Sequence, residues 1–145
     1  GPNVTFEGFV TDAKMRDLMT TARAFIFAAE EDFGIIPVEA QAEGTPVLAL
    51  GRGGALETVK STGIDKTGMF FSEPQPQNIA ACVRAFIAIE GEFSRQSCRK
   101  QAERFSAARF RDEIKTFVQE QFDRVHAPLV PNNEKAPAAH EHEMV

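Results

Sequence analysis

The chain has 145 residues and a formal net charge of -5 at pH 7. This length suits one domain with a core of its own, and the dispersed acidic residues offer no basic surface for nucleic acid and no polybasic membrane anchor. There is no signal peptide and no apolar run of membrane-spanning length, so we expect a cytoplasmic location. Gly1 and Pro2 can be native or a tag remnant, so we assign them no function.

The cysteines and histidines give no pattern of a metal or redox site. Cys82 and Cys98 lie in stretches with a helical pattern and lack Cys-x-x-Cys or Cys/His spacing, so we expect free thiols in a reducing compartment. His126, His140 and His142 fall at or beyond the last predicted helix, and the chain has no Asp-x-Asp pair. We therefore predict no metal site and a reaction that needs no metal.

The first third of the chain predicts strands that alternate with helices. Residues 4–6 favour a short strand, and Thr11 is a plausible N-cap for a helix with one apolar face. Residues 24–28 read as a buried strand. Pro37 suits the first turn of a helix that extends to about residue 43, and residues 46–50 read as the next strand.

The remainder continues this alternation. We predict a short helix at residues 56–60, a short strand at 68–71, and two amphipathic helices whose apolar faces begin at Ile79 and Phe110. The pattern is typical of the α/β class, with a Rossmann-like parallel sheet and helices on both faces. Residues 1–126 would form this domain, and residues 127–145 read as a disordered tail because they lack apolar periodicity.

One segment carries most of the chemical information. It reads Glu31-Asp32-Phe33-Gly34-Ile35-Ile36-Pro37-Val38-Glu39, with two carboxylates eight positions apart. A glycine before a helix start lets the backbone approach a ligand and presents free N–H groups to an anion. The segment therefore favours binding of a phosphorylated, hydroxyl-rich molecule.

The spacing resembles the Glu-x7-Glu signature of retaining family 4 glycosyltransferases. Gly44-Thr45-Pro46-Val47 and Gly53-Gly54-Ala55-Leu56-Glu57 resemble later motifs of that family in the same order. The resemblance covers about residues 3–122 and is closest to bacterial polysaccharide mannosyltransferases. It implies the later part of the C-terminal, donor-binding domain of the two-domain GT-B fold.

The resemblance also implies parts that this chain lacks. The family's N-terminal acceptor domain is absent, as are the first donor-domain strands, whose arginine and lysine neutralise the diphosphate. Arg52 does not occupy either position. We therefore expect a longer physiological enzyme, an inactive isolated chain and an incomplete sheet. The full enzyme would transfer a hexose, with mannose favoured, to a glycan or lipid-linked acceptor, and peripheral membrane association would be compatible with that role.

The resemblance assigns roles to the two glutamates. Glu31 would be the catalytic residue, contacting the donor sugar and supporting positive charge at the anomeric carbon. Glu39 would accept hydrogen bonds from the nucleotide ribose. A solvated acidic loop and an exposed helix glutamate are the respective structural alternatives. The donor would be a nucleotide diphosphate sugar, with GDP-mannose favoured slightly over a UDP-sugar.

Further donor-binding residues follow from the same resemblance. Backbone amides at Phe33, Gly34, Ile35 and Ile36 would meet the phosphates, although both isoleucines also suit core packing.

The remaining family positions lie in two other loops. Phe9 and Val10 would meet the base, largely through the backbone. Gly53 and Gly54 could face an anion or form a plain strand-to-helix turn, and Glu57 could equally be a carboxylate at a helix start.

Two other functions compete with the transferase. A catalytically silent nucleotide-binding or regulatory module would use Glu39 and dispense with Glu31. A glycoside hydrolase would use the two glutamates as acid and nucleophile, but residues eight apart across a loop and a helix start need not face each other. A transferase releases a nucleoside diphosphate, whereas a hydrolase needs no nucleotide.

Overall fold

The computed structural model of the chain describes residues 1–126. The predicted disordered tail, residues 127–145, lies outside the described residues, so that prediction and the domain boundary at residue 126 stay untested. The described residues divide into two units, Gly1–Phe110 and a second unit that begins at Arg111. The first unit contains the sheet and every motif singled out above.

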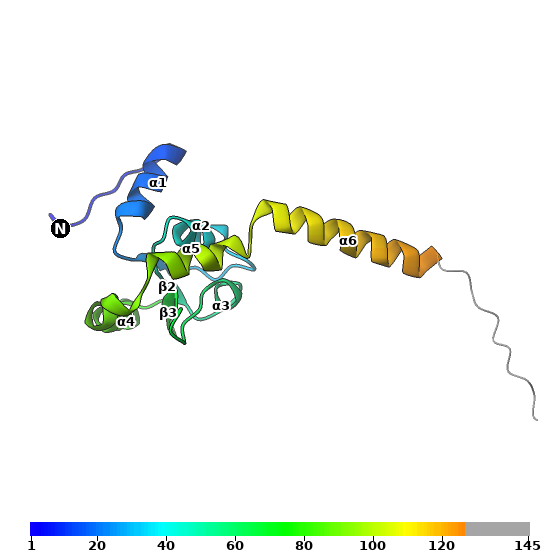
Figure 1. Cartoon of the computed structure of the whole chain (residues 1–145). Coiled ribbons are helices and arrows are strands. Elements are labelled where there is room, and N and C mark those ends of the chain that lie inside the picture. The colour runs from blue at the N-terminus through cyan, green and yellow to red at the C-terminus, as the bar shows by residue number, and fades with distance from the viewer. Residues whose placement is uncertain (127–145) are drawn as a thin grey trace, which may run out of the picture. The chain divides into compact units, whose positions relative to one another are not determined.

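A parallel sheet forms the centre of the first unit (Figure 1). Its strands are β1 (Phe25–Phe27), β2 (Val47–Leu50) and β3 (Gly68–Phe71), in the order β1-β2-β3. Because β2 is the central strand, Val47 is paired with Phe25 on one side and with Gly68 on the other. All four residues of β2 are buried, as expected for an apolar strand covered on both faces.

The described residues form six α-helices and one short 3-10 helix. They are α1 (Asp12–Thr21), α2 (Ile35–Ala42), α3 (Ala55–Thr58), α4 (Pro76–Ile89), η1 (Glu90–Glu92), α5 (Arg95–Glu103) and α6 (Ala107–His126). The predicted helices after Thr11, Pro37, Ile79 and Phe110 are thereby confirmed. Thr11 caps α1 as predicted, since its hydroxyl accepts a hydrogen bond from the Lys14 N–H at 3.3 Å.

The alternating side chains of the sheet build two cores, one on each face. Val47 and Ala49 pack with residues of α1, α2 and α3, whereas Leu48 and Leu50 pack with Phe71 and residues of α4. The side chains of adjacent β2 residues thus point to opposite faces of the sheet, as strand geometry requires. This confirms the α/β class and the prediction of helices on both faces of the sheet.

The predicted strand at residues 4–6 is wrong. Residues 3–8 form neither helix nor strand, and Phe6 and Phe9 are almost completely exposed. A strand is stable only when a neighbour accepts its hydrogen bonds, and none of the described residues pairs with this segment. A β-like sequence pattern at residues 4–6 was therefore not sufficient to form a strand.

Contacts at the C-terminal end of α2 hold this helix in place. Figure 1 shows α2 and α5 side by side, and the two helices are in extensive contact. The Glu43 carbonyl accepts hydrogen bonds from Arg95 at 2.9 Å and from Arg99 at 3.2 Å. The Thr20 hydroxyl of α1 donates to the Glu43 carboxylate at 3.0 Å. Cations at the negative end of the helix dipole add to this attachment.

Helix α6 is amphipathic but has no buried residue. None of the helices in the described part of the chain combines the length and the apolar character that crossing a membrane requires.

Candidate functional site

The carboxyl ends of the parallel strands place three loops along one edge of the sheet. Residues 28–34 follow β1, residues 51–54 follow β2, and residues 72–75 follow β3. This edge is where open α/β sheets bind ligands. The structure therefore gathers here most of the predicted site, including Glu31, the start of α2 and the Gly53-Gly54 turn.

The loops after β1 and β2 are joined by a backbone hydrogen bond. The Gly54 N–H donates to the Glu31 carbonyl at 2.8 Å. The Gly54 N–H is therefore already hydrogen-bonded within the protein, so it is not free to bind an anion directly. The contact also shows that Glu31 and Gly54, 23 positions apart in the sequence, belong to one local structure.

The three consecutive acidic residues of this loop have different surroundings. The Glu30 carboxylate lies 3.9 Å from the Arg52 guanidinium, which also forms a 2.6 Å ion pair with Glu73. By contrast, the Glu31 side chain is exposed and has no hydrogen bond or ion pair with any described residue. The positive charge of Arg52 thus balances the negative charges of Glu30 and Glu73, whereas the Glu31 carboxylate stays available for a ligand.

Free backbone amides lie at the start of α2. Gly34 precedes the helix with φ 75° and ψ 81°, a left-handed conformation that favours glycine, and no side chain caps the helix. The first helix amides lack intrahelical acceptors, and within residues 1–126 the Gly34, Ile35 and Ile36 N–H groups have no other backbone partner. Pro37 has no N–H to satisfy. The arrangement supplies free donors and a positive dipole end without a side chain in the way.

Glu39 lies one helical turn after Ile35 on the exposed face of α2. It borders two hollows, one on each side of the helix. The first lies between α1 and α2 and is lined by Asp12, Met15, Arg16, Met19, Glu39, Ala42 and Glu43. The second lies towards the end of α5 and is lined by Val38, Glu39, Ala42, Arg99, Ala102, Glu103, Phe105 and Ser106. The Glu39 carboxylate has no partner in the described residues, so it can accept hydrogen bonds from a ligand.

Two predicted residues, Phe9 and Val10, lie outside these three loops. Phe9 is fully exposed and Val10 half-buried in the segment before α1, and neither forms a hydrogen bond within the described chain. Their proposed contact with the base stays a prediction.

Two features of the site are not among the predictions from the sequence. The ion pairs join Glu30, Arg52 and Glu73, each two or three positions beyond the end of a different strand. A charged residue at this position after each predicted strand was the sequence signal that could have indicated the ion pairs. The second feature is the edge-to-face contact of Phe33 with Phe105, whose ring centroids are 5.6 Å apart. No local pattern indicated it, because 72 positions separate the two residues.

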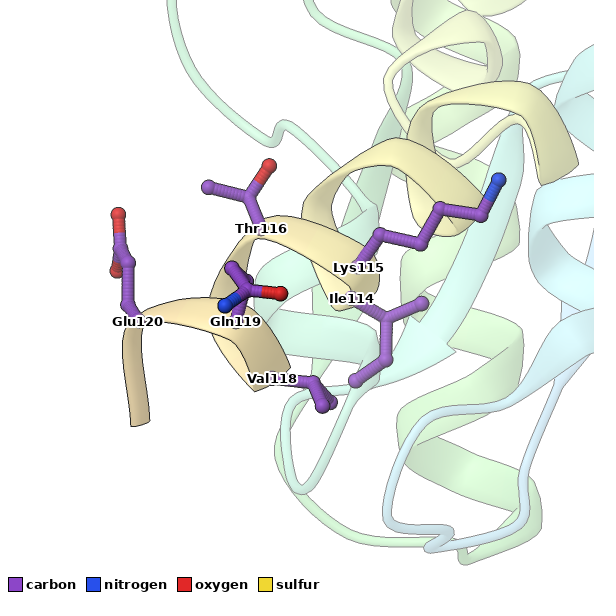
Figure 2. Close-up of a pocket in the computed structure, with 6 residues that line it drawn as sticks. All are labelled: Ile114, Lys115, Thr116, Val118, Gln119 and Glu120. Atoms are coloured by element: carbon purple, nitrogen blue, oxygen red, sulfur yellow. The ribbon is translucent and has the colours of Figure 1, made fainter. Parts of the chain in front are cut away.

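Another hollow lies on α6, as Figure 2 shows. Its lining consists of Ile114, Lys115, Thr116, Val118, Gln119 and Glu120. All six side chains extend from one helix, so they do not enclose a ligand. We assign this hollow no binding function.

Comparisons with known proteins agree with the position of the motifs. The family model described as "Glycosyl transferases group 1" matches residues 1–105. The alpha-1,3/1,6-mannosyltransferase ALG2 of Mus musculus is 28% identical over 120 residues, which are 80% of this chain and 28% of that protein. The D-inositol 3-phosphate glycosyltransferase of Geodermatophilus obscurus is 35% identical over 91 residues, 63% of this chain and 19% of that protein.

A solved structure shows the same fold. Sucrose-phosphate synthase from Thermosynechococcus elongatus aligns with a TM-score of 0.72 and 23% identity, covering 86% of this chain and 31% of that one. The chain thus spans less than a third of the length of these relatives. Because the family model covers well over half of the chain, the chain belongs to the group 1 glycosyltransferase family.

Proposed function

We propose that this chain is the donor-binding part of a retaining glycosyltransferase. The complete enzyme would transfer a mannose from a nucleotide diphosphate sugar to a glycan or lipid-linked acceptor, without a metal. The similarity to ALG2, which is described as a mannosyltransferase, supports mannose over other hexoses. GDP-mannose remains the donor that we favour slightly over a UDP-sugar. The remaining length of the relatives supports a longer enzyme, in which a second domain binds the acceptor.

The observation that carries the proposal is the pairing of a free carboxylate with free amides. Glu31, with no side-chain partner in residues 1–126, lies four positions before Ile35, the first residue of the uncapped helix α2. Amides at a helix start attract the diphosphate, whereas a carboxylate attracts the positive charge that grows on the sugar. A donor that spans both would have its anionic diphosphate and, in the transition state, its positively charged sugar matched by groups of opposite charge.

The chemistry follows from this placement. The bond between the anomeric carbon and the diphosphate oxygen breaks, and its electron pair leaves with the nucleoside diphosphate. The acceptor hydroxyl forms the new bond to that carbon, and its proton passes to the departing diphosphate oxygen. The α2 amides would stabilise the negative leaving group, and Glu31 would stabilise the cationic carbon. Glu39 would hold the ribose diol from the next helical turn.

The proposal separates the two glutamates experimentally. In the complete enzyme, Glu31→Gln should lower kcat about 100-fold with little change in nucleoside diphosphate affinity, because it removes only the charge near the transition state. Glu39→Ala should weaken nucleotide binding by roughly 1 to 3 kcal/mol, because it removes hydrogen bonds to a charged acceptor. Initial transfer rates and calorimetric titration of GDP and UDP measure the two effects.

Asp32→Asn is the matched control, because it removes a carboxylate from the same loop next to Glu31. It should change turnover by less than about threefold, since a general charge effect is screened at this exposed position. Unchanged turnover in Glu31→Gln would reject the catalytic role of Glu31. Nucleotide binding without any transfer by the unmodified complete enzyme would instead favour a nucleotide-binding module without catalysis.

A further inference from the structure

Gly54 has an ordinary backbone conformation that does not require glycine. Its φ of −62° and ψ of −18° lie in the right-handed helical region, which any residue adopts. However, a Cβ atom at this position would lie 2.4 Å from both the Cα and the carbonyl oxygen of Phe33. It would also lie 2.5 Å from the Asp32 carbonyl oxygen. The glycine is therefore required by the space that the Glu31 loop occupies.

Gly53 faces the same loop. A Cβ atom there would lie 2.4 Å from the Glu31 carbonyl oxygen, and the φ of +56° itself disfavours other residues. Together the two glycines contact the backbone of three consecutive residues, and the Gly54 N–H adds its hydrogen bond to Glu31. All these opposing atoms belong to backbone, which cannot yield by a rotamer change.

An aromatic contact holds the end of the same loop. The Phe33 ring packs edge-to-face on Phe105, which follows α5, with an interplanar angle of 68°. The loop is thus attached both to the glycine turn after β2 and to the end of α5. Both attachments act on the backbone or on Phe33, and neither touches the Glu31 carboxylate.

We propose that Gly53 and Gly54 are positioning residues that set the location of the Glu31 carboxylate through its backbone, without contacting the donor. The inference rests on the proposed function of Glu31. Because the Glu31 side chain has no partner in residues 1–126, the protein contacts that place it act through the backbone of its loop. A displacement of about 1 Å at a catalytic group can cost about 100-fold in rate.

The test uses Gly54→Ala in the complete enzyme, since alanine keeps the N–H and adds only the Cβ atom. We expect kcat to fall about 100-fold, while the affinity for GDP or UDP, measured by calorimetry, stays within about threefold. Gly91→Ala is the matched control, because a Cβ atom at Gly91 meets no atom within 4 Å. Its kcat should equal that of the unmodified enzyme.

A double variant separates positioning from an independent role. If Gly54 acts through Glu31, the kcat of the double variant Glu31→Gln/Gly54→Ala should lie within about threefold of the kcat of Glu31→Gln alone. Multiplying rate losses would overturn the inference, as would unchanged turnover in Gly54→Ala or a loss of nucleotide affinity equal to its loss of kcat. Normal turnover in Glu31→Gln would instead reject the catalytic role proposed for Glu31, on which this inference rests.

Phe105→Leu provides the second test if Gly54→Ala does not fold. It leaves the glycine turn untouched and removes the contacts of the Phe105 ring with Phe33 and with the Arg104 guanidinium. We expect kcat to fall about threefold to tenfold, with nucleotide affinity unchanged and no additional loss in the Glu31→Gln background. Unchanged turnover, an equal loss of nucleotide affinity, or a multiplying loss would overturn the inference.

Discussion

At the scale of single residues, Glu31 and Glu39 differ in what fixes them. Glu39 belongs to α2, whose hydrogen bonds and packing hold its backbone. Glu31 belongs to a loop and depends on contacts with distant residues, chiefly Gly54 and Phe105 through Phe33. The same carboxylate chemistry therefore depends on local helix formation at one position and on tertiary packing at the other.

Cys98 illustrates how burial controls a thiol. It is completely buried in α5, and its Sγ lies 4.0 Å from the Thr67 carbonyl. Burial raises the pKa of the Cys98 thiol from 9.0 to about 11, and the positive charges of Arg95 and Arg99 offset this only in part. The buried thiol is therefore neutral and unreactive at physiological pH.

We predict that Cys98 makes unfolding free energy pH-dependent in alkaline solution. Because the folded-state pKa is raised, its contribution is complete below pH 9.0 and is lost as the pH rises to about 11. The total should be about 2 to 3 kcal/mol, which Cys98→Ala should abolish. Urea unfolding of both proteins from pH 7 to 11 measures the difference. Parallel pH profiles would contradict the prediction, as would rapid labelling of Cys98 by a thiol reagent in the native protein.

At the scale of elements, buried amides connect α2, α3 and α5. The Gln41 Nε2 donates to the Pro37 carbonyl at 3.1 Å and to the Thr58 carbonyl at 3.2 Å. The Thr58 carbonyl also accepts from Gln101 at 3.1 Å. However, the buried Oε1 of Gln41 has no partner in the described residues. The favourable bonds of Gln41 are therefore offset by one unsatisfied acceptor.

This balance predicts different effects of two substitutions at Gln41. Gln41→Met keeps the volume, removes the unsatisfied oxygen and leaves Thr58 bonded to Gln101, so the free energy of unfolding should change by less than about 1 kcal/mol. Gln41→Ala leaves a cavity and should cost about 2 to 4 kcal/mol. Denaturant unfolding of both variants distinguishes them. Equal losses would show that the amide bonds outweigh the packing.

At the scale of the whole molecule, the sheet presents an unpaired edge. β1 has a partner only on the β2 side within the described residues, and its Ile26 is 46% exposed. Val4, Phe6 and Phe9 add exposed apolar surface before α1. An unpaired strand and apolar side chains both favour association with another chain.

We therefore predict that the isolated 145-residue chain self-associates at micromolar concentration. Ile26→Lys should reduce the association, because an edge lysine opposes strand pairing and the side chain is already half exposed. Ile87→Lys, at an exposed position of α4, is the control and should associate like the unmodified chain. Sedimentation velocity measures the species present. A stable monomer, or equal effects of both lysines, would contradict the prediction.

The sequence by itself determined the α/β class, the order of the motifs and the helix that begins after Gly34. Each depends on local information: apolar periodicity, residues suited to helix starts, and Gly or Pro at turns. These signals persist because neighbouring residues along the chain largely determine them. The Glu-x7-Glu spacing belongs to the same category, since loop and helix start are adjacent in the sequence.

Only the tertiary structure decided which segments meet. Residues 4–6 have a β-like pattern but form no strand, because no described segment pairs with them. The partners of Arg52, the contact of Phe33 with Phe105 and the packing of Gly54 on the Glu31 loop depend on parallel strands that bring distant loops to one edge. Pairing and close packing are properties of two segments together, so the pattern of either segment alone does not contain them.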